Sequence, residues 1–188
     1  VDVAFPLNTF INIGQYGESQ VIARADLRGG ETMAYDQVLV GRNATRQSAN
    51  AAMRRRLGYA GAYPVPGEKL VCLKNNREEG LLNGTLWTVQ DCTGEPDGVA
   101  LTVVPEDGGA TVETLAYSEP FFYQDAPRWG SGGLNEFTYG YALTTHKAQG
   151  SEWPSVYIVD ESAIARLEAH RWLYTALTRA SEKVLLVR

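Results

Sequence analysis

The sequence predicts an α/β fold in which a parallel sheet is interrupted by a small β-rich insert, and three observations lead to this prediction. Apolar, β-prone runs at 37–40, 155–160 and 184–187 are separated by long segments with helical spacing, as in a parallel sheet. Residues 66–128 instead contain short strand-like runs divided by glycine-containing turns, which is typical of a small antiparallel barrel. With 44% hydrophobic and 21% charged residues, the chain has the composition of a globular protein.

Length and charge limit what the protein can be. The chain has 188 residues, enough for one ordinary domain, or for one domain with a small insert. Its net charge of −5 excludes a protein that binds nucleic acid over its whole surface, but clustered basic residues leave room for a local groove. No apolar run is long enough to span a bilayer and no secretory signal is visible, so we expect a cytoplasmic protein. Because the first residue is Val1 rather than Met, we also expect a piece of a longer protein.

The cysteines and histidines point to no special chemistry of their own. Cys72 and Cys92 each lie in or beside a β-prone run, which favours free buried thiols over a disulfide. His146 and His170 lack neighbouring ligands at the spacing of a zinc site. We therefore expect no structural metal.

The first part of the chain contains one clear helix. Residues 1–35 give no clear pattern, and 21–24 could be a strand or part of a helix. A helix is expected from a cap at Thr45 to Gly58, because apolar residues recur at four-residue intervals, at Ala49, Met53 and Leu57. Its three consecutive arginines, Arg54, Arg55 and Arg56, should mostly point away from the core, either into solvent or toward phosphate groups.

The insert and the return to the sheet follow. Strands are expected in the insert at 69–74, 86–90, 99–104 and 111–115, and residues 121–133 lead out of it. The run from Phe137 to Leu143 then reads as one strand of the parallel sheet, and 161–179 as mostly helix with a break near His170.

Polar residues follow the run 137–143 directly, at Thr144, Thr145, His146 and Lys147. Ligands of an open α/β sheet bind outside the carboxyl ends of its strands, so these side chains lie where such a sheet does its chemistry. A plain surface loop is the alternative interpretation of the same pattern.

The exact strings are more specific than the pattern. The string that starts at Thr144, Thr-Thr-His-Lys-Ala-Gln-Gly-Ser-Glu-Trp-Pro, resembles the fifth conserved motif of superfamily 1B DNA helicases of the RecD and Dda-like branch. Residues 173–180, Leu-Tyr-Thr-Ala-Leu-Thr-Arg-Ala, resemble the sixth. Residues 38–57, with Asn43 and Asn50, resemble the fourth motif region less completely. Pro-Gly-Glu-Lys-Leu-Val at 66–71, followed by Asn-Gly-Thr at 83–85, resembles the SH3-like insert called domain 2B.

This resemblance implies a RecA-like domain 2A of the P-loop NTPase type that itself lacks the P-loop. Domain 2A would comprise 1–65 and 129–188, and the SH3-like β-barrel insert 66–128. A first RecA-like domain, outside this sequence, would hold most of the ATP and Mg²⁺, because no Gly-x-x-x-x-Gly-Lys-Ser/Thr string occurs here. Asp160 and Glu161 are interpreted as an acid pair at a strand end rather than a magnesium site. The isolated fragment should therefore not hydrolyse ATP.

The resemblance also implies roles for individual residues. Thr144, Thr145, His146 and Lys147 would contact single-stranded DNA. Gln149, Gly150 and Glu152 would contact the nucleotide, with Gly150 allowing close approach of the backbone. Arg179 would be the arginine finger, and its alternative is an ordinary cation at a helix C-terminus. Arg42 is a candidate second phosphate ligand.

Two functions of different classes remain open on the sequence. The first is the C-terminal motor domain of a bacterial or phage ATP-dependent DNA helicase in DNA repair and recombination. Its partners would be single-stranded DNA, the N-terminal RecA-like domain and, in an exodeoxyribonuclease V complex, nuclease or helicase subunits. The second is a non-catalytic nucleic-acid-binding or protein-binding module built on the SH3-like barrel.

Overall fold

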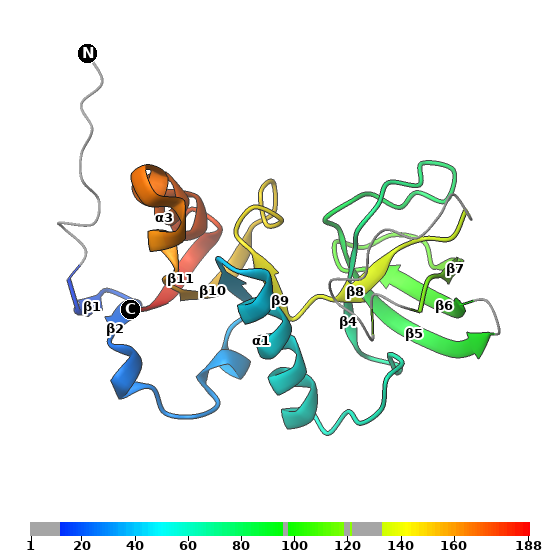
Figure 1. The fold of residues 1–188 in the computed structure, drawn as a ribbon, viewed down its shortest axis with the longest axis horizontal. Coiled ribbons are helices and arrows are strands. Elements are labelled where there is room, and N and C mark those ends of the chain that lie inside the picture. The colour runs from blue at the N-terminus through cyan, green and yellow to red at the C-terminus, as the bar shows by residue number, and fades with distance from the viewer. Residues whose placement is uncertain (1–11, 96–97, 119–120, 122–132) are drawn as a thin grey trace, which may run out of the picture. The chain divides into compact units, whose positions relative to one another are not determined.

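The computed structural model describes residues 12–95, 98–118, 121 and 133–188 (Figure 1). The chain divides into two compact units. The first unit consists of Val1–Ala49 and Ala142–Arg188, and the second unit of Asn50–Tyr141. The second unit extends further on both sides than the insert predicted at 66–128, and the domain boundaries themselves stay a prediction.

The first unit is built on a mixed six-stranded sheet in the order β1-β2-β11-β10-β3-β9. Five of these strands are parallel, and β1 adds an antiparallel edge next to β2. The predicted α/β class with a parallel sheet is thus confirmed. The strands are β1 Gly14–Tyr16, β2 Ser19–Ile22, β3 Gln37–Val40, β9 Ala142–Thr144, β10 Trp153–Val159 and β11 Ala180–Val187.

The centre of this sheet is apolar because its strands are covered on both faces. Val38, Leu39 and Val40 of β3 are all buried, and so is the adjacent Ile158 of β10. A continuous apolar run, rather than an alternating one, is typical of a parallel strand buried on both sides. This explains why the run at 37–40 could be recognised in the sequence.

The helical elements of the first unit differ in detail from the prediction. Helix α1 spans Asn43–Arg56, so Thr45 lies inside it instead of capping it. The predicted break near His170 falls earlier, at Arg166, whose φ of 48° interrupts the helical path. The other elements are the 3₁₀ helices η2 Arg24–Asp26, η3 Glu31–Ala34 and η4 Ser162–Glu168, and helix α3 Ala169–Leu177.

The second unit contains a five-stranded antiparallel sheet in the order β7-β6-β5-β4-β8. Among the described residues, β7 and β8 are its two edges and do not pair, so the closed barrel that we expected is not shown. The strands are β4 Lys69–Cys72, β5 Leu86–Glu95, β6 Gly98–Pro105, β7 Val112–Ala116 and β8 Phe137–Tyr139.

The prediction of one strand from Phe137 to Leu143 is wrong, because the run supplies a strand to each sheet. Strand β8 pairs with β4 in the second unit, whereas β9 pairs with β3 in the first (Figure 1). Gly140 lies between them, and a Cβ there would come within 2.9 Å of the Leu70 carbonyl carbon. The chain therefore changes sheets at a position where no side chain fits.

Both cysteines are free, as expected, although Cys72 is buried and Cys92 only half-buried. Burial raises the pKa of the Cys92 thiol to about 11, and the charges of Asp91 and Glu68 add to this effect. Within the described part of the chain, no helix is both long enough and apolar enough to cross a membrane.

Candidate nucleotide and DNA contact site

The segment between β9 and β10 is a compact series of turns. After Thr144, the amides of Lys147 and Ala148 both donate to the Thr144 carbonyl, at 2.9 and 3.1 Å. The Ser151 amide then donates to the Ala148 carbonyl at 3.2 Å, and Ala148 is fully buried. The predicted motif residues are therefore held by the local backbone and by one apolar anchor.

Parallel strand directions place the two halves of this segment at opposite ends of the sheet. His146 and Lys147 follow the carboxyl end of β9, whereas Gly150 and Glu152 precede the amino end of β10. Strand β10 has seven residues. At about 3.3 Å per residue, the two ends of such a strand are roughly 20 Å apart.

Arg179 lies at the same end of the sheet as Glu152. It directly precedes β11, and the residues that follow Glu152 and Arg179 form a register pair, Trp153 with Ala180. The Trp153 amide donates to the Arg179 carbonyl at 2.9 Å. The amino ends of β10 and β11 thus bring the predicted finger next to the predicted nucleotide residues.

The guanidinium of Arg179 is half-buried and is held by oxygen atoms of two segments. Its Nη1 donates to the Ser151 carbonyl at 3.0 Å, and its Nε to the Thr175 carbonyl at 3.1 Å. Nη2 donates to the Thr178 hydroxyl at 3.2 Å. The planar head is therefore oriented by the end of helix α3 and by the turn before β10 together.

Gly150 needs glycine because of its backbone conformation. Its φ is +90°, in the left-handed region that side chains disfavour, and an added Cβ would meet nothing within 4 Å. The backbone there faces open space, next to the exposed side chains of Gln149 and Glu152. This is the environment that a close backbone approach to a ligand requires.

The four residues predicted to contact DNA differ in exposure. Thr144 and Thr145 are buried, and Thr145 is only 1% exposed. Its amide and its hydroxyl both donate to the Val40 carbonyl, at 2.9 and 3.4 Å, which fastens the end of β9 to β3. His146 is exposed and Lys147 half-buried, so these two residues present the surface of the segment.

Arg42 lies at the other end of the sheet from Arg179, because it follows the carboxyl end of β3. Its side chain is 64% exposed, and its Nε lies 3.9 Å from Glu161 Oε1. The structure therefore does not bring Arg42 together with the predicted nucleotide residues. It places Arg42 beside the residues predicted to contact DNA, since β3 and β9 are neighbours.

Glu161 organises this end of the sheet, which the sequence did not indicate. Its Oε2 accepts from the amides of Gly41 and Arg42, at 2.8 and 2.9 Å, and its Oε1 from the Thr45 hydroxyl at 2.7 Å. A Cβ at Gly41 would lie 2.8 Å from Glu161 Cβ. Only a folded structure shows that this carboxylate accepts hydrogen bonds from the backbone amides at the start of helix α1.

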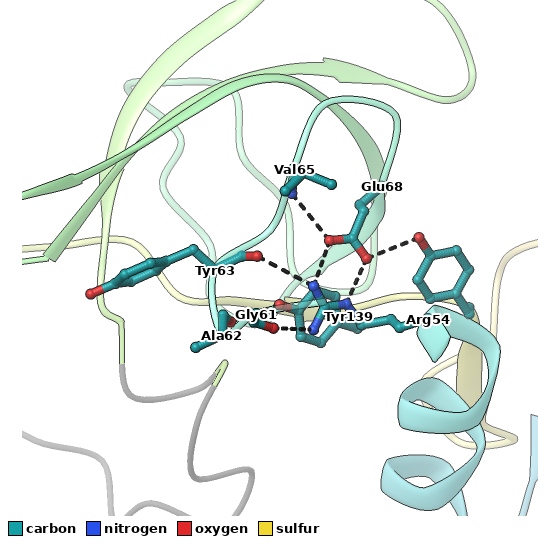
Figure 2. Close-up of polar contacts among 8 residues, drawn as sticks. Arg54, Gly61, Ala62, Tyr63, Val65, Glu68 and Tyr139 are labelled. Atoms are coloured by element: carbon teal, nitrogen blue, oxygen red, sulfur yellow. Dashed lines mark hydrogen bonds and ion pairs between the residues drawn. The ribbon is translucent and has the colours of Figure 1, made fainter. Parts of the chain in front are cut away.

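Arg54 is the other residue whose place the sequence did not predict. It is 9% exposed and pairs with the buried Glu68, so it neither lies on a solvated face nor points toward a phosphate (Figure 2). The expectation that the three arginines mostly point away from the core fits the exposed Arg55 and Arg56, but not the buried Arg54.

Comparisons with known proteins show which helicases the chain is similar to. Residues 139–187 match the family model of the UvrD-like helicase C-terminal domain. Over 118 residues, 63% of this chain, the sequence is 36% identical to an ATP-dependent RecD2 DNA helicase of Deinococcus radiodurans. The chain spans only 14% of that relative's length.

Solved structures of Pif1 helicases share the fold. A Bacteroides Pif1 bound to ssDNA has a TM-score of 0.52 at 18% identity, covering 79% of this chain and 40% of its own. Pif1 from Bacteroides in complex with ADP-AlF3 and ssDNA has a TM-score of 0.54 at 16% identity, covering 93% and 42%. Pif1 from Candida albicans has a TM-score of 0.50 at 18% identity, covering 80% and 44%.

The matched family model covers the C-terminal strands and helix that carry the predicted motifs, not the β-rich part of the chain. The resemblance read from the motifs is therefore confirmed: residues 139–187 match a UvrD-like helicase C-terminal domain, the chain is similar to a RecD2 helicase, and Pif1-like superfamily 1B helicases are structural neighbours.

Proposed function

We propose that this chain is the C-terminal motor part of an ATP-dependent DNA helicase, with Arg179 as its arginine finger. The observation that carries the proposal is the bond from Arg179 Nη1 to the Ser151 carbonyl at 3.0 Å. It joins the sixth-motif arginine to the turn that contains Gly150 and Glu152. A half-buried, permanently charged fork beside exposed backbone is suited to bind phosphate oxygens.

The separation of the two predicted contact sets supports the same function. A translocating motor has to bind nucleotide and DNA at once, on different surfaces. The nucleotide residues gather at the amino ends of β10 and β11, and His146 and Lys147 lie at the carboxyl end of β9. In this proposal, Thr144 and Thr145 position the DNA-contacting turn rather than reach the DNA themselves.

ATP and its Mg²⁺ would be held mainly by a RecA-like domain outside this sequence. The residues present fit the phosphate end of a nucleotide, through Arg179, but not a metal at that end. Asp160 and Glu161 lie at the opposite end of the sheet and accept hydrogen bonds from Ser162 and from the start of α1. The bound ion would neutralise phosphate charge, and this chain would supply the arginine finger, Arg179. The isolated chain is then inactive as an ATPase.

Further parts of the proposal follow from the relatives. The two Bacteroides Pif1 structures were solved with ssDNA, which is the partner we propose for this chain. The second unit would be the SH3-like insert of this helicase branch. A role in DNA repair and recombination, with nuclease or helicase subunits of an exonuclease V complex as partners, is the corresponding cellular proposal. A stand-alone binding module is less well supported, because the family match lies outside the insert.

The experiment that tests the two-surface arrangement uses the full-length protein with His146→Ala and Lys147→Ala together. We expect weaker binding to single-stranded DNA. The slope of the logarithm of the binding constant against the logarithm of salt concentration should also fall, by about one released counterion. At saturating DNA, the KM for ATP should stay unchanged. Arg28→Ala, an exposed arginine of the first unit away from this site, is the matched control. Unchanged DNA affinity and salt dependence in the double variant would place the DNA track elsewhere.

A further inference from the structure

Two unusual features occur side by side at Arg166 and Leu167, in the 3₁₀ helix η4 of the first unit. Among the residues that the structure describes, Arg166 is the only one other than glycine with a positive φ. Leu167 is 91% exposed, more than any other large apolar side chain in the described part of the chain. A single exposed leucine is ordinary on a protein surface, but one that directly follows a strained residue calls for an explanation.

The backbone of Arg166 has a conformation that favours glycine. Its φ is 48° and its ψ is −111°, close to the first central position of a type II′ turn. The Ala169 amide donates to the Arg166 carbonyl, which holds the chain in place where helix α3 begins. Glycine would adopt this conformation without strain, so an arginine here lowers stability. Strained residues are concentrated at functional sites, which makes the Arg166 side chain a candidate for one.

Helix η4 lies at the end of the sheet where the residues predicted to contact DNA are found. It follows the carboxyl end of β10, and β10, β3 and β9 are neighbours in the sheet. A Cβ at Gly41, directly after β3, would lie 2.7 Å from Ile164 Cδ1, so η4 packs against the chain beside Arg42. The segments that carry Arg166, Arg42 and His146 therefore lie along one edge of the sheet.

The charge along this edge favours an anionic ligand. The side chain of Arg42 is 64% exposed. Arg166 is also exposed and has no ion pair with any residue that the structure describes. The neighbouring carboxylates are each bonded within the fold: Asp160 to Arg188, Glu161 to the start of α1, and Glu168 to Arg171. Two exposed guanidinium groups thus remain with little acidic charge to offset them.

Single-stranded DNA fits this combination, because it presents an anionic backbone and uncovered apolar base faces together. We propose that Arg166 and Leu167 form a further DNA contact next to Arg42, in which Arg166 binds a phosphate and Leu167 packs against a base. This inference rests on the proposed helicase function and extends its DNA site beyond the residues of the fifth motif. The surface of another protein domain could also cover Leu167, but it gives no reason for the exposed arginines.

Arg166→Gly in the full-length protein tests the cationic half of the contact. Glycine removes the guanidinium and relieves the strain, so the variant should melt at or above the wild-type temperature. Its affinity for a single-stranded oligothymidine should nevertheless fall. The slope of the logarithm of the binding constant against the logarithm of salt concentration should decrease by about 0.7, as for one lost phosphate contact. Arg28→Gly, the same change at an exposed loop position between β2 and β3, should bind DNA as the wild type does.

Leu167→Ala tests the apolar half. It removes an uncharged side chain, so the affinity for the oligothymidine should fall about three- to tenfold while the salt slope stays unchanged. Leu167→Met should keep most of the affinity, because it retains an apolar side chain of similar size. Met33→Ala truncates another exposed apolar side chain, in η3 before the amino end of β3, and should bind like the wild type.

Photo-crosslinking identifies what covers position 167 directly. A benzophenone amino acid at this position of the full-length protein should attach to the oligothymidine on irradiation. Attachment confined to other parts of the protein would assign the surface to a protein domain and overturn the proposal. Wild-type affinity and salt slope in both Arg166→Gly and Leu167→Ala would overturn it as well.

The same measurements distinguish a failure of this contact from a failure of the proposed function. If the double variant at His146 and Lys147 loses DNA affinity while the variants at Arg166 and Leu167 do not, only the further contact fails. A wild-type protein that does not bind single-stranded DNA would contradict the helicase function and the further contact together.

Discussion

Arg179→Ala in the full-length protein is the strongest test of the finger assignment. A finger arginine stabilises charge on the transferred phosphoryl group and contributes about 10³- to 10⁵-fold to the rate. That range corresponds to roughly 4–7 kcal/mol at the transition state. A helix-end cation, the alternative, contributes only about 0.3–1 kcal/mol to the helix. Because the two magnitudes differ so clearly, steady-state ATPase at saturating DNA distinguishes them.

The structure also predicts what the variant should leave intact. Arg179 bonds to oxygens at the end of α3 and before β10, so its loss will loosen that end of the sheet, while β9 and its anchors to β3 are untouched. Affinity for single-stranded DNA should therefore stay near normal while ATP turnover is abolished. Arg179→Lys should rescue poorly, because an ammonium cannot replace the fork that bonds to Ser151 and Thr175 together.

The matched control is Arg171→Ala, which removes an exposed arginine from helix α3, the helix just before Arg179, together with its ion pair to Glu168. Turnover there should stay near that of the wild type, since exposed pairs contribute little. If Arg179→Ala retained turnover within about threefold, the rate loss would be far below what a finger contributes, and Arg179 would be an ordinary helix-end cation. Thermal melting of both variants excludes unfolding as the cause of any loss.

Two further predictions follow from the structure. Arg42→Ala should leave the KM for ATP unchanged, because Arg42 lies at the end of the sheet opposite to Arg179. The KM is measured by ATPase titration at saturating DNA, and an increase would show that Arg42 does contact the nucleotide. The pKa of Cys92 is raised from 9.0 to about 11, mainly by burial, so the folded state holds this proton more tightly than the unfolded state. Its contribution to stability is thus complete below pH 9.0 and is lost as the pH rises through about 11. Native alkylation of Cys92, followed by mass spectrometry, should show a midpoint near 11 that shifts down in urea, and a native midpoint near 9.0 would contradict the burial argument.

The central strands of the first unit could be predicted because their sequence signal is local. The run at 37–40 is apolar without interruption and is buried on both faces. The same signal failed at Phe137–Leu143, where two short strands of different sheets follow each other. No local pattern separates them, because Gly140 matters through its close approach to Leu70 and Leu86 of other strands.

The sequence predicted which residues form the candidate site, but not how the fold arranges them. The motifs at 144–152 and 173–180 identified the residues of the site. The burial of Thr145, however, depends on a hydrogen bond to the Val40 carbonyl, more than a hundred positions earlier in the chain. The same holds for Arg54, which looked like part of a solvated basic run until Glu68 was placed against it. Side-chain charge is visible in a sequence, whereas the partner that allows its burial is not.

The compactness of the motif string has a physical reason in this fold. The segment between Thr144 and Trp153 has to connect the carboxyl end of one parallel strand to the amino end of another, and it does so with four internal backbone hydrogen bonds and a buried Ala148. Such a segment has few alternative conformations, and each of its ends is held by its own contacts. One end bears the exposed His146 and is fastened to β3 through Thr145, and the other is bonded to Arg179 through Ser151. The loss of Arg179 therefore acts directly on the turn before β10, whereas the bonds from Thr145 to the Val40 carbonyl keep the end that bears His146 in place.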